Sequence, residues 1–250
     1  GIAAMSASGQ YGPARACAGI VGFADLSLGV NVGPILDAHM ALSRRFRGIR
    51  HAAGWDASDA VRNSHTNPPR HLLGDDTFRQ GVAELEKRNL SFDAWLYHLQ
   101  IPELVELAQD FPSLTIVADH FCGPLGIGPY VGRQQAVYAQ WQTDFKALAA
   151  CPNVYAKLGG LAMPINGFGW HRRSTPATSD ELVATTGPYH LWAIKHFGAE
   201  RCMFESNFPV DKQSCSYHVL WNAFKKLASD LTVGERDALF HDTAKKVYRI

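Results

Sequence analysis

Short apolar runs recur six times along this chain of 250 residues, and each run ends in polar or ionisable side chains. The runs occupy residues 18–24, 46–49, 92–96, 114–118, 154–156 and 202–204. Apolar stretches of this length, bounded by turn residues, predict buried β-strands. The polar residues that follow them therefore predict the carboxyl ends of strands, where the functional side chains of parallel sheets gather.

Helix signals lie between most of these runs, as early prolines, capping side chains and terminal glycines. They predict helices at residues 31–45, 75–88, 101–110, 134–150, 178–198 and 232–248, the fifth with a restart at Gly187-Pro188. Strands that alternate with helices predict an α/β fold, here a TIM-type (β/α) barrel. A closed barrel needs two more strands, and the first seventeen residues have room for one helix, at 11–16 or earlier. The barrel is therefore predicted to be distorted and incomplete at its N-terminus.

Two long stretches without regular periodicity follow predicted strand ends. They span residues 54–73 and 159–178, and the second contains a run of aromatic and basic residues. Long loops in a compact domain usually carry binding or lid functions. Both are expected to lie over the mouth of the barrel.

The composition suits one large domain, residues 1–250, because 46% of the chain is hydrophobic and 19% is charged. A net charge of +1 without a basic stripe argues against nucleic acid as a partner. The sequence contains neither an apolar stretch long enough for a membrane span nor a signal-peptide pattern. Five cysteines without CxxC spacing indicate buried thiols in a reducing compartment, so a cytoplasmic location is expected.

His120 is the strongest candidate for chemistry. It follows the apolar run 114–118 and Asp119, and it precedes a Gly-Pro turn. A histidine at a strand tip can ligate a metal, polarise a carbonyl group or relay a proton, and the alternative is a structural ring bonded to backbone. Strand alternation places Asp119 on the opposite side, where it would brace a neighbouring element.

Basic side chains end three other predicted strands. Only one of Arg50 and His51 can face the barrel interior, and an arginine there would bind a substrate carboxylate. His98 is a candidate catalytic residue, with simple packing at a strand end as the alternative. Lys157 is a candidate substrate ligand, a carbamylated metal bridge or a member of a structural ion pair, of which the ion pair is preferred.

Asn207 lies in the polar run that follows the last predicted strand. It can orient water or substrate, but it cannot act as a general base, whereas Glu205 or Asp211 could if either faces inward. Trp170 and His171, in the second long loop, are expected either to close over a substrate or to form an oligomer contact.

Taken together, these motifs resemble the amidohydrolase-related family of TIM-barrel hydrolases, in the branch that contains sugar-acid lactonases and 2-pyrone-4,6-dicarboxylate lactonase. The resemblance covers nearly the whole chain. It rests on Phe46-Arg47-Gly48-Ile49-Arg50-His51, Val117-Ala118-Asp119-His120, Asn153-Val154-Tyr155-Ala156-Lys157-Leu158-Gly159-Gly160 and Arg201-Cys202-Met203-Phe204-Glu205-Ser206-Asn207-Phe208-Pro209-Val210.

The resemblance implies a distorted barrel that hydrolyses a lactone or related ester with an activated water. His120 matches a family histidine that binds metal or polarises the substrate carbonyl, and Arg50 matches a region that binds substrate carboxylates. Asn207 stands where the family usually has an aspartate that activates water. The family's opening His-x-His strand is absent, so the chain resembles the C-terminal three quarters of a member.

Two alternatives stay open for the cofactor: one divalent metal such as Zn with His120 among its ligands, or hydrolysis without metal. The expected substrate is a small acidic lactone or ester. A decarboxylase of the same superfamily and a catalytically degenerate barrel that acts as a binding or scaffold module are the alternative functions. Because open strand edges favour association, a homodimer is expected as one way to cover them.

Overall fold

The structure, a computed structural model, describes residues 2–10, 12–13 and 16–250. Its six strands are β1 (Ile20–Gly22), β2 (Phe46–Ala52), β3 (Ser91–Trp95), β4 (Ile116–Ala118), β5 (Val154–Leu158) and β6 (Cys202–Phe204). They form one sheet in chain order, and every neighbouring pair is parallel. The six predicted strands and their parallel arrangement are confirmed.

Helices follow the strands as predicted, with three differences. The helices are α1 (Ile2–Ala7), α2 (Gly33–Leu42), α3 (Asp76–Lys87), α4 (Ile101–Asp110), α5 (Gln134–Ala149), α6 (Ser179–Phe197), α7 (Tyr217–Leu227), α8 (Val233–Asp237) and α9 (Thr243–Tyr248). Helix α6 runs through Gly187-Pro188 without the predicted restart. Helix α7, capped by Ser216, was not predicted. A π-helical segment, Ala238–Asp242, joins α8 to α9.

The N-terminal region was only partly predicted. A helix was expected at residues 11–16 or earlier, and α1 lies earlier, at Ile2–Ala7. Residues 11, 14 and 15 lie outside the described residues, so that part of the prediction is not addressed. No helix within the described ranges is both long enough and apolar enough to cross a membrane.

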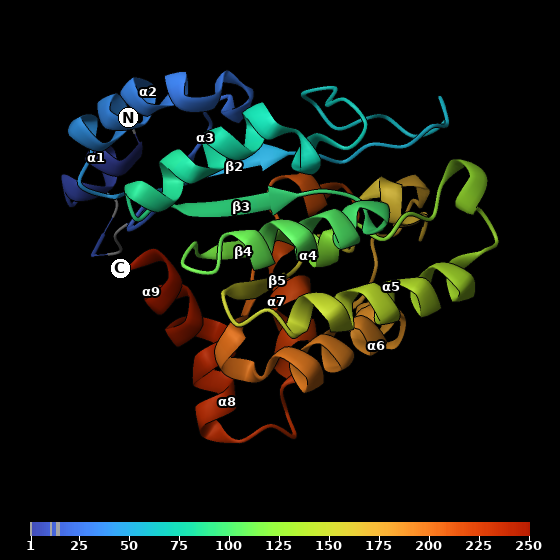
Figure 1. The fold of residues 1–250 in the computed structure, drawn as a ribbon. Coiled ribbons are helices and arrows are strands. Elements are labelled where there is room, and N and C mark those ends of the chain that lie inside the picture. Colours follow the sequence, from blue (N-terminus) through green and yellow to red (C-terminus); the bar gives the residue numbers. More distant parts are fainter. Residues whose placement is uncertain (1, 11, 14–15) are drawn as a thin grey trace.

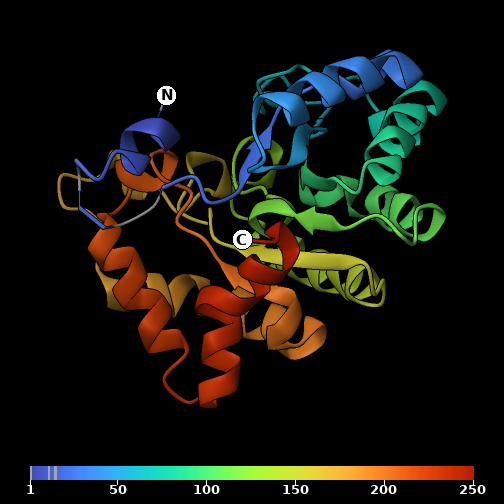
Figure 2. The same cartoon turned by 90° about the vertical axis from the view of Figure 1, so that its left-hand side faces the viewer.

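The sheet curves into an open, incomplete barrel with two different faces (Figures 1 and 2). Helices α2 to α6 lie along the outer side of the curve, and α9 lies on its inner side. The main apolar core fills the space between the outer face and its helices, and it includes Ile49, Phe92, Ile116, Val154 and Phe204. Burying a large apolar side chain of this kind contributes about 1.5–3 kcal/mol, so this layer supplies most of the packing energy.

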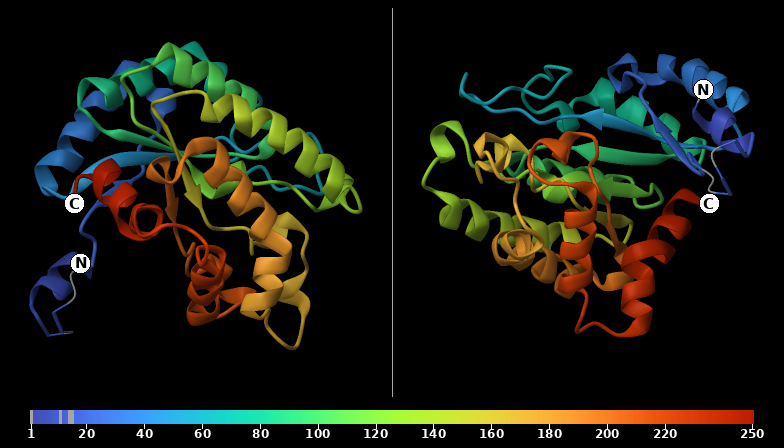
Figure 3. Two further views of the ribbon diagram at one scale, coloured as in Figure 1. Left: turned by 90° about the horizontal axis from the view of Figure 1, so that it is seen from below. Right: turned by 180° about the vertical axis from the view of Figure 1, so that it is seen from behind.

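Helix α9 covers part of the inner face. Its Val247 packs with Val117 of β4 and Met203 of β6, in a small apolar cluster separate from the main core. Figure 3 shows the same helix beneath the strands from a second direction. The rest of the inner face, toward the carboxyl ends of the strands, carries polar side chains.

Candidate active site

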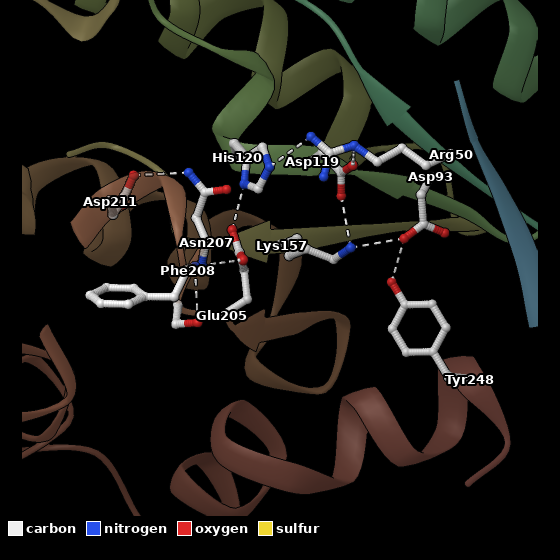
Figure 4. A network of polar contacts seen from close by, with 11 residues as sticks. Arg50, Asp93, Asp119, His120, Lys157, Glu205, Asn207, Phe208, Asp211 and Tyr248 are labelled. Carbon is white, nitrogen blue, oxygen red and sulfur yellow. Dashed lines mark hydrogen bonds and ion pairs between the residues drawn. The ribbon is translucent and has the colours of Figure 1, made fainter. Parts of the chain in front are cut away.

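A row of charged side chains crosses the inner face of the sheet from β2 to β6 (Figure 4). Its members are Arg50, Asp93, Asp119, Lys157 and Glu205. Each lies two residues after another inward-facing position of its strand, because side chains alternate between the faces of a strand. Arg50 and Asp93 are also partners in the register of β2 with β3.

Lys157 is the centre of this row. Its Nζ lies 2.8 Å from Asp93 Oδ2 and 2.8 Å from Asp119 Oδ1. Burial alone would lower the pKa of the Lys157 ammonium, but the two carboxylates outweigh it and hold the pKa well above its usual value. Of the three predicted roles for Lys157, the structure places it in the structural ion pair.

Asp119 joins the two cations of the row. Its side chain is fully buried, and its Oδ2 lies 3.1 Å from Arg50 Nε. Burial by itself would raise the pKa of the Asp119 carboxyl, yet Lys157 and Arg50 lower it below its usual value. Asp119 therefore remains charged and fixes the guanidinium of Arg50 at the open end of the row.

Tyr248, on the C-terminal helix, ties α9 to the same row. Its hydroxyl donates to Asp93 Oδ2 at 2.5 Å, and Ser91 donates to Asp93 Oδ1 at 2.9 Å. Burial raises the pKa of the Tyr248 hydroxyl well above its usual value, so the group stays protonated and acts as a donor. Asp93 consequently accepts from three sides.

His120 connects this row to β6. Its Nδ1 lies 2.5 Å from Glu205 Oε1, and its Nε2 lies 3.0 Å from Arg50 Nη2. A guanidinium can only donate, so Nε2 accepts and Nδ1 carries the hydrogen that is donated to Glu205. Burial would raise the pKa of the Glu205 carboxyl, but His120 and Lys157 lower it, so a carboxylate orients the ring.

An unusual backbone brings His120 and Asp119 to the same side. His120, Phe121 and Cys122 have φ values of 54°, 56° and 55°, in the left-handed region that non-glycine residues avoid. Such residues cost about 1–3 kcal/mol each and are concentrated at functional sites. The prediction that alternation separates Asp119 from His120 was wrong, because the strand ends at Ala118 and the chain turns there.

Gly160 makes room for the ring. A Cβ atom at this position would lie 2.7 Å from His120 Nδ1, closer than real contacts allow, and the glycine also has a φ of 81°. Any side chain here would push His120 away from Glu205. The two glycines of the sequence motif are thus explained by two close approaches after β5, because a Cβ at Gly160 would meet His120 and a Cβ at Gly159 would lie 2.1 Å from the carbonyl oxygen of Glu205.

Asn207 lies beside this pair, also with a left-handed backbone, at φ 50°. Its backbone N–H donates to Glu205 Oε2 at 2.7 Å, and its Nδ2 donates to Asp211 Oδ1 at 2.9 Å. Burial raises the pKa of the Asp211 carboxyl to about 7, with the Asn207 amide opposing the shift. Figure 4 shows Asn207 with its nitrogen toward Asp211 and its oxygen on the His120 side.

His51 does not join Arg50, its neighbour in sequence. It faces the outer side, where its ring packs edge-on against Phe78 of α3 at a centroid distance of 5.1 Å. Its Nε2 lies 3.5 Å from Asp25 Oδ1, beside a separate cleft of about 250 Å³. The prediction that only one of the two faces inward is confirmed, and that residue is Arg50.

His98 also lies apart from His120. Its ring is buried against Tyr130 at a centroid distance of 5.4 Å, and its Nδ1 accepts from the backbone N–H of Leu125 at 3.4 Å. Burial lowers the pKa of His98 to about 4, so the ring is neutral and packed. The structure does not bring it into the network of His120.

The side chains of Trp170 and His171, neighbours in one loop, lie in different surroundings. Trp170 is buried against Phe168 in the main core, so its ring does not cover the charged row. His171 borders a different cleft of about 430 Å³, together with Arg172 and the start of α5. The two residues therefore do not form a lid over His120.

The residues present do not fit a metal ion well. No group of three or more His, Cys, Asp or Glu side chains suited to a metal occurs among the described residues. The Nε2 of His120 is capped by the Arg50 guanidinium, and the carboxylates of Asp93 and Asp119 are both paired with Lys157. A divalent cation would have to displace a fixed positive charge to reach His120.

Sequence reasoning missed several members of the network. It proposed Glu205 and Asp211 only as alternatives for a base, and it assigned no role to Asp93 or Tyr248. The signal for Glu205 was available, since Glu205 lies two residues after Met203 and therefore on the same face. No sequence signal connects Tyr248 with Asp93, because 155 residues separate them.

Comparison with known families identifies the family of the chain. The family model described as amidohydrolase matches residues 14–250. The chain belongs to this amidohydrolase family. The family resemblance inferred from its strand-end motifs is confirmed.

Similar proteins share most of the chain. The uncharacterised protein y4mH of Sinorhizobium fredii is 40% identical over 232 residues, which are 93% of this chain and 70% of that protein. An L-fucono-1,5-lactonase of Burkholderia multivorans is 27% identical over 236 residues, 93% of this chain and 72% of that enzyme. This amidohydrolase chain thus spans about seven tenths of these relatives.

Solved structures support the fold. A crystal structure of an amidohydrolase from Burkholderia multivorans with bound HEPES has a TM-score of 0.75 at 27% identity, and it covers 93% of this chain and 74% of that one. A zinc-bound crystal form of an amidohydrolase from the same organism has a TM-score of 0.74. A putative 2-pyrone-4,6-dicarboxylic acid hydrolase of Pseudomonas putida, at 23% identity and a TM-score of 0.60, shares the fold.

Proposed function

We propose that this amidohydrolase hydrolyses a lactone by attack of water on the ring carbonyl. Relatives named L-fucono-1,5-lactonase match 93% of the chain at 27% and 28% identity. The observation that carries the proposal is the placement of the buried His120 between the Glu205 carboxylate and the guanidinium of Arg50, whose side chain is partly exposed. This arrangement places a base, His120, in direct contact with its orienting group, Glu205, and with an electrophile, Arg50.

His120 is the proposed general base. With Nδ1–H donating to Glu205, its Nε2 has the lone pair that can accept a proton from water. Glu205 holds the tautomer and stabilises the imidazolium that forms, as the carboxylate of a catalytic triad does. His120 thus takes the role of the family's water-activating aspartate, whose position is held here by Asn207, because an amide cannot accept the proton.

Arg50 is the proposed electrophile. Its side chain is 39% exposed, and its Nη2 now donates to His120 Nε2. A bound lactone would take over this donor through its carbonyl oxygen, freeing Nε2 for water. The tetrahedral oxyanion then lies against the guanidinium, and the ring C–O bond breaks as His120 returns its proton to the leaving alkoxide, giving a hydroxy acid.

The charge balance favours a neutral lactone over the acidic one expected from the sequence. Two cations, Arg50 and Lys157, share the row with the three carboxylates of Asp93, Asp119 and Glu205. One negative charge is therefore in excess before Asp211 is considered. Arg50 is already paired through Nε, so little attraction is left for a substrate carboxylate.

The test is a panel of neutral and acidic lactones, carried out with and without chelator and with metal content measured. We expect hydrolysis of a neutral sugar lactone, reduced by roughly 10²–10⁴-fold in His120→Gln, since general base catalysis contributes about that much. His241→Gln, at an exposed histidine beside Asp242, is the control and should keep full activity. Equal activity of His120→Gln, or release of carbon dioxide instead of hydrolysis, would refute the proposal.

The homodimer stays a prediction. Strands β1 and β6 stand at the two ends of the strand order, and within the described residues each pairs with one neighbour only. Strand edges without a pairing partner favour association with a second copy. Light scattering of the purified chain measures the oligomeric state.

A further inference from the structure

Asp211 shares a small internal cavity with a histidine from another helix. The cavity has a volume of about 10 Å³ and is bordered by Asp211, by His190 of α6 and by the backbone near Ala162, among mostly apolar neighbours. Asp211 and His190 are 0% and 2% exposed. A volume of this size corresponds to one water molecule.

Each of the two residues has one buried polar atom without a hydrogen-bond partner among the described residues. These atoms are Asp211 Oδ2 and His190 Nε2. Their other polar atoms are bonded, since Asp211 Oδ1 accepts from Asn207 and His190 Nδ1 lies 2.9 Å from the carbonyl oxygen of Thr186. A buried polar atom without a partner costs about 1–3 kcal/mol, and the two residues that carry these atoms line the same cavity, which calls for a common partner.

The hydrogen positions decide what that partner must be. A carbonyl oxygen only accepts, so His190 Nδ1 carries its hydrogen, and burial lowers the pKa of His190 to about 4, which leaves Nε2 as an acceptor. Above about pH 7, where Asp211 is ionised, its carboxylate is also an acceptor. Two acceptors cannot bond to each other, but a water can donate one hydrogen to each.

We propose that one buried water binds in this cavity, donating to Asp211 Oδ2 and to His190 Nε2, and that His190 is thereby a positioning residue for Asp211 and Asn207. The water remains suitable if Asp211 gains a proton, because it can then accept from Asp211 and still donate to His190. The backbone amide of Ala162, which also acts on Asp211, provides a third polar group nearby. Buried waters typically make about three hydrogen bonds.

The consequence for the site follows through Asn207. Asp211 accepts from Asn207 Nδ2 and so directs the side-chain oxygen of Asn207 toward His120. If the water leaves, Asp211 loses one of its fixed partners and the amide of Asn207 can rotate. This consequence depends on the proposed function, whereas the water site does not.

The first test is a high-resolution crystal structure of the whole chain together with ¹⁵N NMR of its histidines. We expect an ordered water about 2.7–3.2 Å from both atoms and a His190 ring protonated at Nδ1 only. An empty cavity, a metal ion identified by anomalous scattering, or a ring protonated at Nε2 and bonded directly to Asp211 would overturn the proposal.

The second test uses variants in the same helix. His190→Phe should lose the water and lower kcat about threefold to tenfold with little change in KM, the loss expected for one hydrogen bond. His190→Gln restores an acceptor and should recover most of that activity. His196→Phe is the matched control, because His196 also bonds the carbonyl four residues back, at 2.8 Å, but stacks on Trp192 away from the cavity.

The two proposals can fail separately. A wild-type chain that hydrolyses no lactone would end the proposed function, and the crystallographic and NMR results would still decide on the water. Conversely, an active enzyme in which His190→Phe and His196→Phe behave alike would remove the positioning role of His190.

Discussion

The two faces of the same five strands, β2 to β6, have opposite chemistry. On the outer face Phe92 and Ile116 are completely buried in an apolar layer under helices. On the inner face the alternate positions Asp93, Asp119 and Lys157 form a continuous row of ion pairs. The outer face is stabilised by packing, which tolerates exchange among apolar residues of similar volume. The inner face depends on charge pairing, in which the loss of one member leaves its partners uncompensated.

The largest effect should come from removing the shared cation. Lys157→Met would leave Asp93 and Asp119 without it, and breaking a buried ion pair by removing one partner costs about 3–5 kcal/mol. Leu158→Met, the next residue on β5 but on the apolar face, should cost less than about 1.5 kcal/mol. Urea unfolding of both variants measures their losses in the free energy of unfolding. Equal losses would contradict the proposed difference between the two faces.

Asp211, which lies outside the charged row, should make the free energy of unfolding depend on pH. The dependence should have the opposite sense from that of an ordinary paired carboxylate. Burial raises the pKa of Asp211 to about 7, so the folded state keeps a proton that the unfolded chain releases. Its contribution to stability is therefore complete below about pH 4 and lost as the pH rises to about 7. Asp211→Asn should be more stable than wild type at pH 8 by up to about 4 kcal/mol, and equal near pH 4. Unfolding free energies measured across this range would contradict the assignment if the difference were constant.

The next comparison separates orientation from charge at His120. Glu205→Gln keeps the size of the side chain but removes the carboxylate that stabilises the imidazolium, and kcat/KM should fall about 10²-fold, or about 2.7 kcal/mol. Glu200→Gln, at an exposed glutamate just before β6, serves as the matched control. Steady-state kinetics on the preferred lactone test this, and an unchanged Glu205→Gln enzyme would exclude the proposed dyad.

The smallest effect should be seen where α9 meets the row. Tyr248→Phe removes the donor to Asp93 and should destabilise the fold by about 1 kcal/mol, since Lys157 and Ser91 still serve that carboxylate. Tyr138→Phe removes a hydroxyl that donates to the Pro188 carbonyl on the helical side, and it should cost less because that group is partly exposed. Thermal unfolding ranks the two, and a reversed order would argue against a role for α9 in holding the row.

The failures of the sequence reasoning have physical causes. Period-two alternation correctly separates Arg50 from His51, because both lie inside β2. The same rule fails for Asp119 and His120, because β4 ends at Ala118 and the next residues adopt left-handed conformations. His98 and Trp170 look like site residues from their positions after strands, yet both are packed away from His120. A strand-end position predicts the edge of the sheet on which a residue lies but does not fix the direction of its side chain.

The order of the strands, most of the helices between them, the parallel sheet and the family follow from the sequence alone, because hydrophobic periodicity and capping chemistry act over a few residues. The sequence also identifies Arg50 and His120 as candidates from their local motifs. Only the tertiary structure joins His120 to Glu205, 85 residues away, and Tyr248 to Asp93, 155 residues away. Such contacts depend on how the curved sheet and α9 pack, and the same packing decides which ionisable side chains are buried, paired and shifted in pKa.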